Sequence, residues 1–209
     1  MNDTPPDYEA IQKAAKENYA KFAREFPRRL AKLEDGAAKR ARDSRKSLFV
    51  RLEELYKSMD EVFAFVKAYT PCRQGCCSCC YYEIEVGNIG VVHMERNLGI
   101  RCDCPPIPIV KPHGLPCPFL RDGSCTIYPH RPYHCRKHVA LVPTPYWCHP
   151  DRSNRQGFMM LNFATFDEAM ANLCFEFGKF EARDIRNVFP WGLGTADARG
   201  SITKSSQAS

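Results

Sequence analysis

Apolar residues recur at helical spacing in two segments near the start of the chain. In the first segment they lie three or four residues apart until Pro27, at Tyr8, Ile11, Ala15, Tyr19, Phe22 and Phe26. In the second they alternate spacings of four and three without a break, at Leu48, Leu52, Leu55, Met59, Val62, Val66 and Tyr69. Each pattern places one apolar stripe along a helix. We expect the two helices to pack as a hairpin on the core or on a second copy of the chain.

A further helix is predicted towards the end of the chain. The segment FDEAMANLCFEFGKFEARDIRNVF predicts a helix near Asp167 to Val188, with Asp167 as its N-cap and Cys174 as a packed thiol. Prolines recur from Pro71 to Pro150, which favours loops and short turns over long strands. The small polar residues from Gly192 onward predict a disordered tail.

These patterns predict a mainly α protein. N-terminal helices and a C-terminal helix are expected to surround a small, irregular core that is rich in cysteine. The predicted divisions are an N-terminal helical region (1–70), a cysteine-cluster domain (71–150) whose chemistry is derived below, a C-terminal helical region (151–190) and a disordered tail (191–209). The N-terminal helices are also the candidate surface for a protein partner or for self-association.

Composition restricts where such a protein works. Of the 209 residues, 26% are charged and 44% are hydrophobic, and no run approaches the roughly 20 apolar residues that a membrane helix needs. The first residues lack the basic start and apolar stretch of a secretory signal, so a cytoplasmic location is expected. Thiols stay reduced there, which favours metal ligation or catalysis over disulfides for the 12 cysteines.

One stretch of the chain is strongly basic. Residues 28–46 carry eight basic and three acidic side chains, whereas the whole chain has a net charge of only +6. A basic face of this kind can meet phosphate, so a zinc module that binds nucleic acid is one alternative. A solvated helix surface is the commoner meaning, and few aromatic residues stand among these charges to stack on bases.

The cysteines are concentrated in two blocks that both follow Pro71. In PCRQGCCSCCYYE, four of them stand at chelating spacing, and Gly75 allows the backbone to turn between them. Cys79 and Cys80 are adjacent and point in different directions, so they are not expected to bind the same tetrahedral ion. Two centres, or one multinuclear cluster, are therefore predicted. The second block completes two four-thiolate sites, and the candidate ligands are Cys72, Cys76, Cys79, Cys80, Cys117, Cys125, Cys135 and Cys148.

The two blocks resemble a known family, the bacterial YkgJ-like cysteine-cluster proteins labelled as a zinc- or iron-chelating domain. CRQGCCSCC is similar to the opening cluster of that family, and PCPFLRDGSCTIYPHRPYHC is similar to its second block. Cys148 matches a final cysteine. The resemblance covers Cys72 to Cys148 and implies metal chelation by the eight candidate cysteines. Four cysteines fall outside the pattern, namely Cys77, Cys102, Cys104 and Cys174.

The metal itself is left open by the residues, because four-thiolate sites suit zinc and iron-sulfur clusters alike. Flagellin lysine methylases resemble this family in carrying a similar cluster, which implies an iron-sulfur-dependent protein-lysine methyl-transfer enzyme as an alternative. Cys135 as a nucleophile and Cys102 with Cys104 as a redox pair are further enzymatic alternatives, and no catalytic residue is assigned.

Other side chains of the two blocks have expected supporting roles. A zinc ion with four thiolates has a net charge of minus two, so positive groups are expected nearby. The candidates are Arg73, Arg131 and Arg136. Three histidines adjoin or follow ligand cysteines, but eight thiols already fill two sites. His134, His138 and His149 are therefore expected at the surface or around the ligands rather than on the metal.

Overall fold

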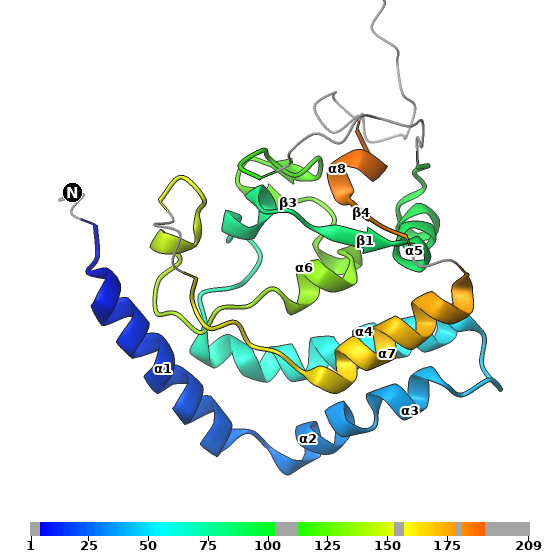
Figure 1. Cartoon of the computed structure of the whole chain (residues 1–209), viewed down its shortest axis with the longest axis horizontal. Helices are drawn as coiled ribbons and strands as arrows, with labels where there is room; N and C mark the ends of the chain where they lie inside the picture. Colours follow the sequence, from blue (N-terminus) through cyan, green and yellow to red (C-terminus); the bar gives the residue numbers. More distant parts are fainter. Residues whose placement is uncertain (1–4, 103–112, 153–156, 179–180, 191–209) are drawn as a thin grey trace, which may run out of the picture.

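The computed structural model describes residues 5–102, 113–152, 157–178 and 181–190, and over these the protein is mainly helical, as predicted (Figure 1). The longer helices are α1 (Tyr8–Glu25), α2 (Arg28–Asp35), α4 (Leu48–Val66), α5 (Asn88–Leu98) and α7 (Ala164–Phe177). Shorter ones are α3 (Ala37–Ala41), α6 (Tyr133–Lys137) and α8 (Ile185–Val188). Single 3-10 turns are η1 (Lys67–Tyr69), η2 (Ser78–Tyr81), η3 (Tyr128–His130) and η4 (Tyr146–Cys148).

Helix α1 runs from Asp7, whose carboxylate caps it, to the extended backbone at Phe26 before Pro27. Its beginning lies against the loop that carries Cys148, where the indole of Trp147 donates to the carbonyl of Pro6 at 2.9 Å. Further along, the Asn18 side-chain amide donates to the Leu141 carbonyl at 3.0 Å. The first helix is therefore fastened directly to the cysteine-rich part of the chain.

Helix α4 is the central element of the helical layer. Ser47 caps it, and its apolar stripe is buried from Leu52 to Val66. The hairpin expected with α1 is wrong, because α4 packs instead on α3 and α7, which run beside it in Figure 1. α1 meets the end of α4 through Phe22, whose ring lies 6.1 Å from that of Phe65. The stripe is thus covered within one chain.

The C-terminal helix differs from its prediction at both ends. α7 begins at Ala164 rather than at Asp167, whose carboxylate accepts hydrogen bonds from Tyr133 and Lys137 of α6 at 2.7 and 2.6 Å. It ends at Phe177, since Gly178 takes φ +141°, which breaks the helical backbone. The predicted helix is therefore divided into α7, the strand β4 (Ala182–Asp184) and α8. Cys174 is a packed thiol, as expected.

Strands are few and short among the described residues, also as predicted. β1 (Glu85–Gly87) pairs antiparallel with β4, with Glu85 opposite Asp184. β2 (Leu120–Arg121) and β3 (Ser124–Cys125) form a hairpin. Its turn holds Asp122 and Gly123 at φ 47° and 72°, the left-handed pair that a two-residue hairpin turn requires.

The apolar core has a large part and two smaller ones, and the cysteines lie where these parts meet. The large part is built by α4, α7 and their neighbours, with Cys72 packed against it. A smaller cluster around Val86, Met94 and Phe189 has Cys117, Cys125 and Cys135 packed on it. The smallest joins α1 to Ala140 and Val142, with Cys148 at its edge.

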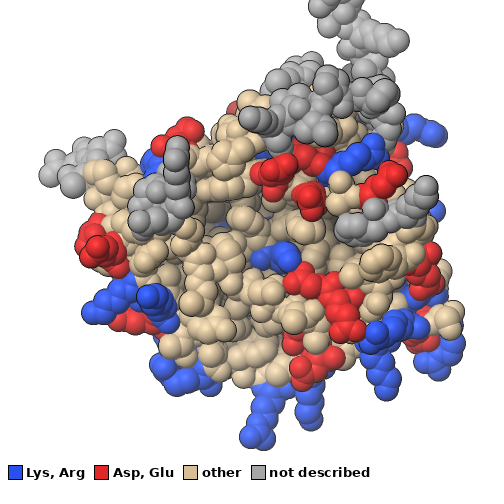
Figure 2. All heavy atoms as spheres, in the orientation of Figure 1, with Lys and Arg blue, Asp and Glu red and all other residues tan. Residues whose placement is uncertain are grey.

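The basic stretch 28–46 forms α2, α3 and the loop after them. Figure 2 shows its basic side chains along the lower edge of the view, with acidic side chains beside them. Ion pairs join Arg29 to Glu61, Arg42 to Glu168 and Lys46 to Glu54. Within the described part of the chain, no helix is long and apolar enough to cross a membrane. The predicted tail 191–209 lies outside the described residues.

Candidate metal centre

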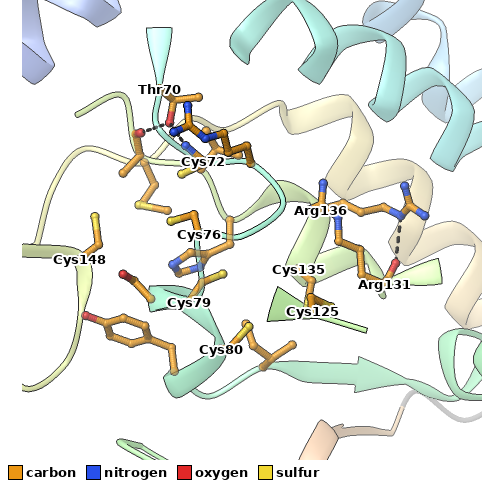
Figure 3. Close-up of a pocket in the computed structure, with 18 of the residues that line it drawn as sticks. Thr70, Cys72, Cys76, Cys79, Cys80, Cys125, Arg131, Cys135, Arg136 and Cys148 are labelled. Atoms are coloured by element: carbon orange, nitrogen blue, oxygen red, sulfur yellow. Dashed lines mark hydrogen bonds between the residues drawn. The ribbon is translucent and has the colours of Figure 1, made fainter. Parts of the chain in front are cut away.

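All eight candidate cysteines line one cavity of about 240 Å³ between the helical layer and the short sheets (Figure 3). They come from loops, 3-10 turns, the strand β3 and the helix α6, spread over residues 72–148. Cys77 and Cys174 are free thiols that do not line this cavity. Cys102 takes part in a disulfide, and Cys104 lies outside the described residues.

The first cysteine block is held by a few short hydrogen bonds. The Thr70 hydroxyl donates to the Ala140 carbonyl at 2.6 Å and accepts from the Cys72 amide at 3.1 Å. Gly75 takes φ +92°, which lets the chain reverse before Cys76. The 3-10 turn η2 then presents Cys79 and Cys80 as successive residues, about 120° apart around its axis.

The second block is fastened to the first through the backbone of Cys80. Its carbonyl accepts from the Cys117 amide at 2.7 Å and from the Arg186 guanidinium at 2.9 Å. The β2–β3 hairpin then supplies Cys125, and α6 supplies Cys135. Two features therefore bring together residues that are far apart in the sequence. The bonds to the Cys80 carbonyl hold η2 beside Cys117, and Cys117, Cys125 and Cys135 all pack against the smaller apolar cluster.

Asp184 fixes the position of Arg186, which in turn contacts Cys80. Its carboxylate accepts from the amides of Ile84 and Arg186 at 2.8 Å, and it forms an ion pair with the Arg186 side chain. Both side chains of the pair are largely buried, with 3% of Asp184 and 11% of Arg186 exposed. Arg186 can reach the Cys80 carbonyl only while this pair orients it.

Replacing Asp184 by alanine should therefore destabilise the full-length, metal-loaded protein by about 3–5 kcal/mol, since it removes the only described carboxylate that neutralises the largely buried Arg186 guanidinium. Chemical denaturation followed by circular dichroism measures this change. Asp151→Ala is the matched control, because that carboxylate is 80% exposed beside His149 and its loss should change stability little. Equal unfolding free energies for the two variants contradict the role given to Asp184.

Two pairs of thiols are joined by S–H···S hydrogen bonds. The Cys76 thiol donates to Cys72 and lowers the pKa of Cys72 to about 6, with the charge of Arg131 acting in the same direction. The Cys80 thiol likewise donates to Cys79 and lowers its pKa. The pKa of each donor is raised, first by holding this proton and then by burial.

The other four thiols have raised pKa values, so they keep their protons at neutral pH. Burial raises the pKa of Cys117 and of Cys148 to about 11, and it raises those of Cys125 and Cys135 as well. Because thiolates are the metal ligands, metal must displace these protons, and binding weakens as the pH falls.

Iodoacetamide should modify Cys72 faster than Cys148 in metal-free protein at pH 7. With a pKa near 6, Cys72 is mostly thiolate there, and its rate should fall only below about pH 6. Cys148, with a pKa of about 11, should instead react about tenfold faster for each unit of rising pH. Mass spectrometry of the labelled peptides measures both profiles, and parallel profiles contradict the assigned protonation.

Arg131 is a positive group that acts on several candidate thiols, as expected from the sequence. Its charge lowers the pKa of Cys72, Cys79, Cys125 and Cys135, although hydrogen bonds or burial act more strongly on each. Its guanidinium carbon lies 4.0 Å from the centre of the Tyr128 ring, and its Nε atom is buried without a hydrogen-bond partner. Arg131 therefore carries a charge into the cavity wall that protein groups do not fully satisfy.

Arg136 has a different role from the one expected. It forms an ion pair with Asp60 and stacks 4.4 Å above the centre of the Tyr56 ring, so its charge is already paired. Its Nε donates to the backbone carbonyl of Arg131 at 2.9 Å, a bond that Figure 3 shows. Arg136 thus holds the backbone that carries Arg131.

His138 is the histidine that lies around the candidate ligands, one of the two placements expected for it. It lines the cavity, and burial lowers its pKa, so the ring is neutral near pH 7 and able to accept a bond. Its place in CRKH, one turn of helix after Cys135, was the available signal. His134 and His149 do not line the cavity.

The sulfur atoms share a cavity but do not yet form coordination shells. Across the described residues, no group of three or more histidine, cysteine, aspartate or glutamate side chains lies close enough to hold a metal ion. The eight ligands therefore stay a prediction. Binding requires these side chains to turn towards common centres, which the loops and 3-10 turns that carry them permit.

A cavity lined by eight thiols between helices is typical of a cysteine-cluster metal-binding protein. Residues 71–161 match the model of the family described as "CxxCxxCC: Putative zinc- or iron-chelating domain". This match confirms the resemblance drawn from the two cysteine blocks, and it supports metal binding by the cysteines of this region. Comparisons with curated proteins and with solved structures found no match to this chain.

Proposed function

We propose that this protein binds two zinc or iron ions, or an iron-sulfur cluster, through eight cysteine thiolates, and that it serves in metal handling or as a metal-stabilised interaction module. The single observation that carries the proposal is the gathering of all eight candidate thiols at one cavity from segments up to 76 positions apart. The matched family description supports the same chemistry.

The donor set fits this class of metal. Thiolates are soft ligands, which favour zinc, copper(I) and iron-sulfur centres over magnesium or calcium. Four thiolates around a divalent ion leave a net charge of minus two, and Lys67, Arg73 and Arg131 line the same cavity with positive charge. A bound ion supplies the attraction that holds deprotonated sulfur atoms together.

Elemental analysis of the full-length protein, purified without oxygen, tests the proposal. We expect two zinc or iron ions per chain, or, in the iron-sulfur case, iron with an equal amount of acid-labile sulfide and visible charge-transfer absorption. An excess of a thiol-competing chelator should remove the metal and increase proteolysis between residues 71 and 150. Protein that binds less than one equivalent of zinc, iron or cobalt after anaerobic reconstitution overturns the proposal.

The two alternatives weighed from the sequence have no comparable support. The matched family description names metal chelation and neither methyl transfer nor nucleic acid. In the basic stretch, Arg29, Arg42 and Lys46 are in ion pairs with carboxylates of α4 and α7, which is the arrangement of a solvated helix surface.

A further inference from the structure

The order of the cysteines along the chain suggests that each block binds one ion, four ligands from residues 72–80 and four from residues 117–148. The fold places them differently. Cys148 comes from the second block, yet it lies on the side of the cavity occupied by Cys72 and Cys76 (Figure 3). Cys80 comes from the first block, yet it lies on the side of Cys125 and Cys135.

The bonds around Cys80 explain its place. Its carbonyl is joined to the Cys117 amide at 2.7 Å, so these two residues stay side by side. Cys117, Cys125 and Cys135 all pack against the smaller apolar cluster around Val86 and Phe189. One backbone bond and one shared cluster therefore bring together a set of four thiols from η2, the hairpin region and α6.

The remaining thiols meet around Ala140. Cys72 and Cys76 both line the cavity, and the Cys72 amide donates to the Thr70 hydroxyl at 3.1 Å. The same stretch is fixed by the bond from Thr70 to the Ala140 carbonyl. Ala140 belongs to the small apolar cluster against which Cys148 packs. Cys148 is thus the second-block cysteine that the fold delivers to Cys72.

Cys79 lies at the boundary between the two sets. It follows Cys76 by three residues and precedes Cys80 within one 3-10 turn, where successive side chains diverge by about 120°. Since Cys80 is committed to the side of Cys117, Cys79 is left for the other set. Its place in the proposed assignment therefore follows from the geometry of η2 and from the bond that fixes Cys80 beside Cys117.

We propose that the metal centres are interleaved, one formed by Cys72, Cys76, Cys79 and Cys148 and the other by Cys80, Cys117, Cys125 and Cys135. This inference rests on the proposed function, and it assigns each ligand to its ion. All ligands of the second centre then lie in the sequence between Cys79 and Cys148, which are both ligands of the first centre.

Four double serine variants test the assignment, with cobalt(II) and zinc as the probe metals. Cys76→Ser with Cys148→Ser, and Cys80→Ser with Cys135→Ser, each remove two ligands of one proposed centre and should retain one ion per chain. Cys76→Ser with Cys80→Ser, and Cys135→Ser with Cys148→Ser, damage both centres and should retain none. Metal per chain is measured after gel filtration, together with the thiolate-to-cobalt absorption and the helical circular dichroism.

The opposite pattern overturns the proposal. If Cys76→Ser with Cys80→Ser and Cys135→Ser with Cys148→Ser each keep one ion, while the other two double variants keep none, each cysteine block binds its own ion. Loss of all metal from all four variants indicates a single multinuclear cluster and overturns it as well. For variants that lose helical signal, cadmium NMR of the wild-type protein decides, because couplings from each cadmium to cysteine β-protons name its ligands directly. Failure of the wild-type protein to bind metal instead overturns the proposed function.

Discussion

Replacing Cys135 by serine should lower the bound metal from two ions to one per chain and expose the cysteine-rich region to proteolysis. Cys135 lies at the cavity on α6, where it is partly buried beside other candidate ligands. Structural zinc contributes on the order of 10–16 kcal/mol of apparent folding free energy in small zinc domains. Losing one centre should therefore be the most damaging single change. Metal analysis and limited proteolysis over residues 71–150 measure the effect.

Cys174→Ser is the matched control for this prediction. Cys174 is a buried thiol on α7 whose pKa burial raises to about 11, but it does not line the cavity. Its replacement should leave two ions bound, with a loss of packing stability alone. Equal metal content and equal protease resistance in the two variants refute the ligand assignment.

Replacing Arg131 by glutamine should weaken metal binding by roughly 10- to 100-fold, the range for groups that support metal ligands without touching the ion. The guanidinium acts on four thiols, and its buried Nε has no partner within the described residues. Without it, the negative charge of the metal-thiolate centres is compensated less well. Competition against a zinc chelator of known affinity measures the loss.

Two further variants show whether charge or packing is responsible. Arg131→Lys keeps the charge but loses the planar group over the Tyr128 ring, so its affinity should lie between those of wild type and Arg131→Gln. Arg29→Gln removes an exposed partner of Glu61, far from the cysteines, and should bind metal normally. Unchanged affinity in Arg131→Gln would show that this cation does not support the centre.

Much of the fold could be predicted from local patterns. The stripe from Leu52 to Val66 is buried as its spacing predicts, and the helix ends before Thr70 and Pro71. The helices that pack on this stripe could not be predicted, because any apolar surface in the chain can bury it. α3, with three buried alanines in a five-residue helix, took the place that the longer stripe of α1 was expected to fill.

The candidate site shows a similar division. The two cysteine blocks predicted which thiols line the cavity, because ligand spacing is a local property. The connections between blocks depend on long-range bonds, such as those from Asp184 to Ile84 and from Arg186 to Cys80. No sequence pattern near the cysteines indicates them. The break of the last helix at Gly178, which brings Arg186 to the cysteines, was likewise missed.

The single turn η2 has a consequence for how the protein fills with metal. Cys79 and Cys80 stand next to each other in it, one peptide bond apart, and they belong to the two different proposed centres. An ion that draws one of these sulfur atoms inwards must fix the whole turn, and with it the direction of the other side chain. The first ion therefore bears the entropic cost of ordering the turn, and the second ion binds a turn that is already ordered. We therefore expect positive cooperativity: partly loaded samples should contain mainly empty and doubly filled chains, as native mass spectrometry can count.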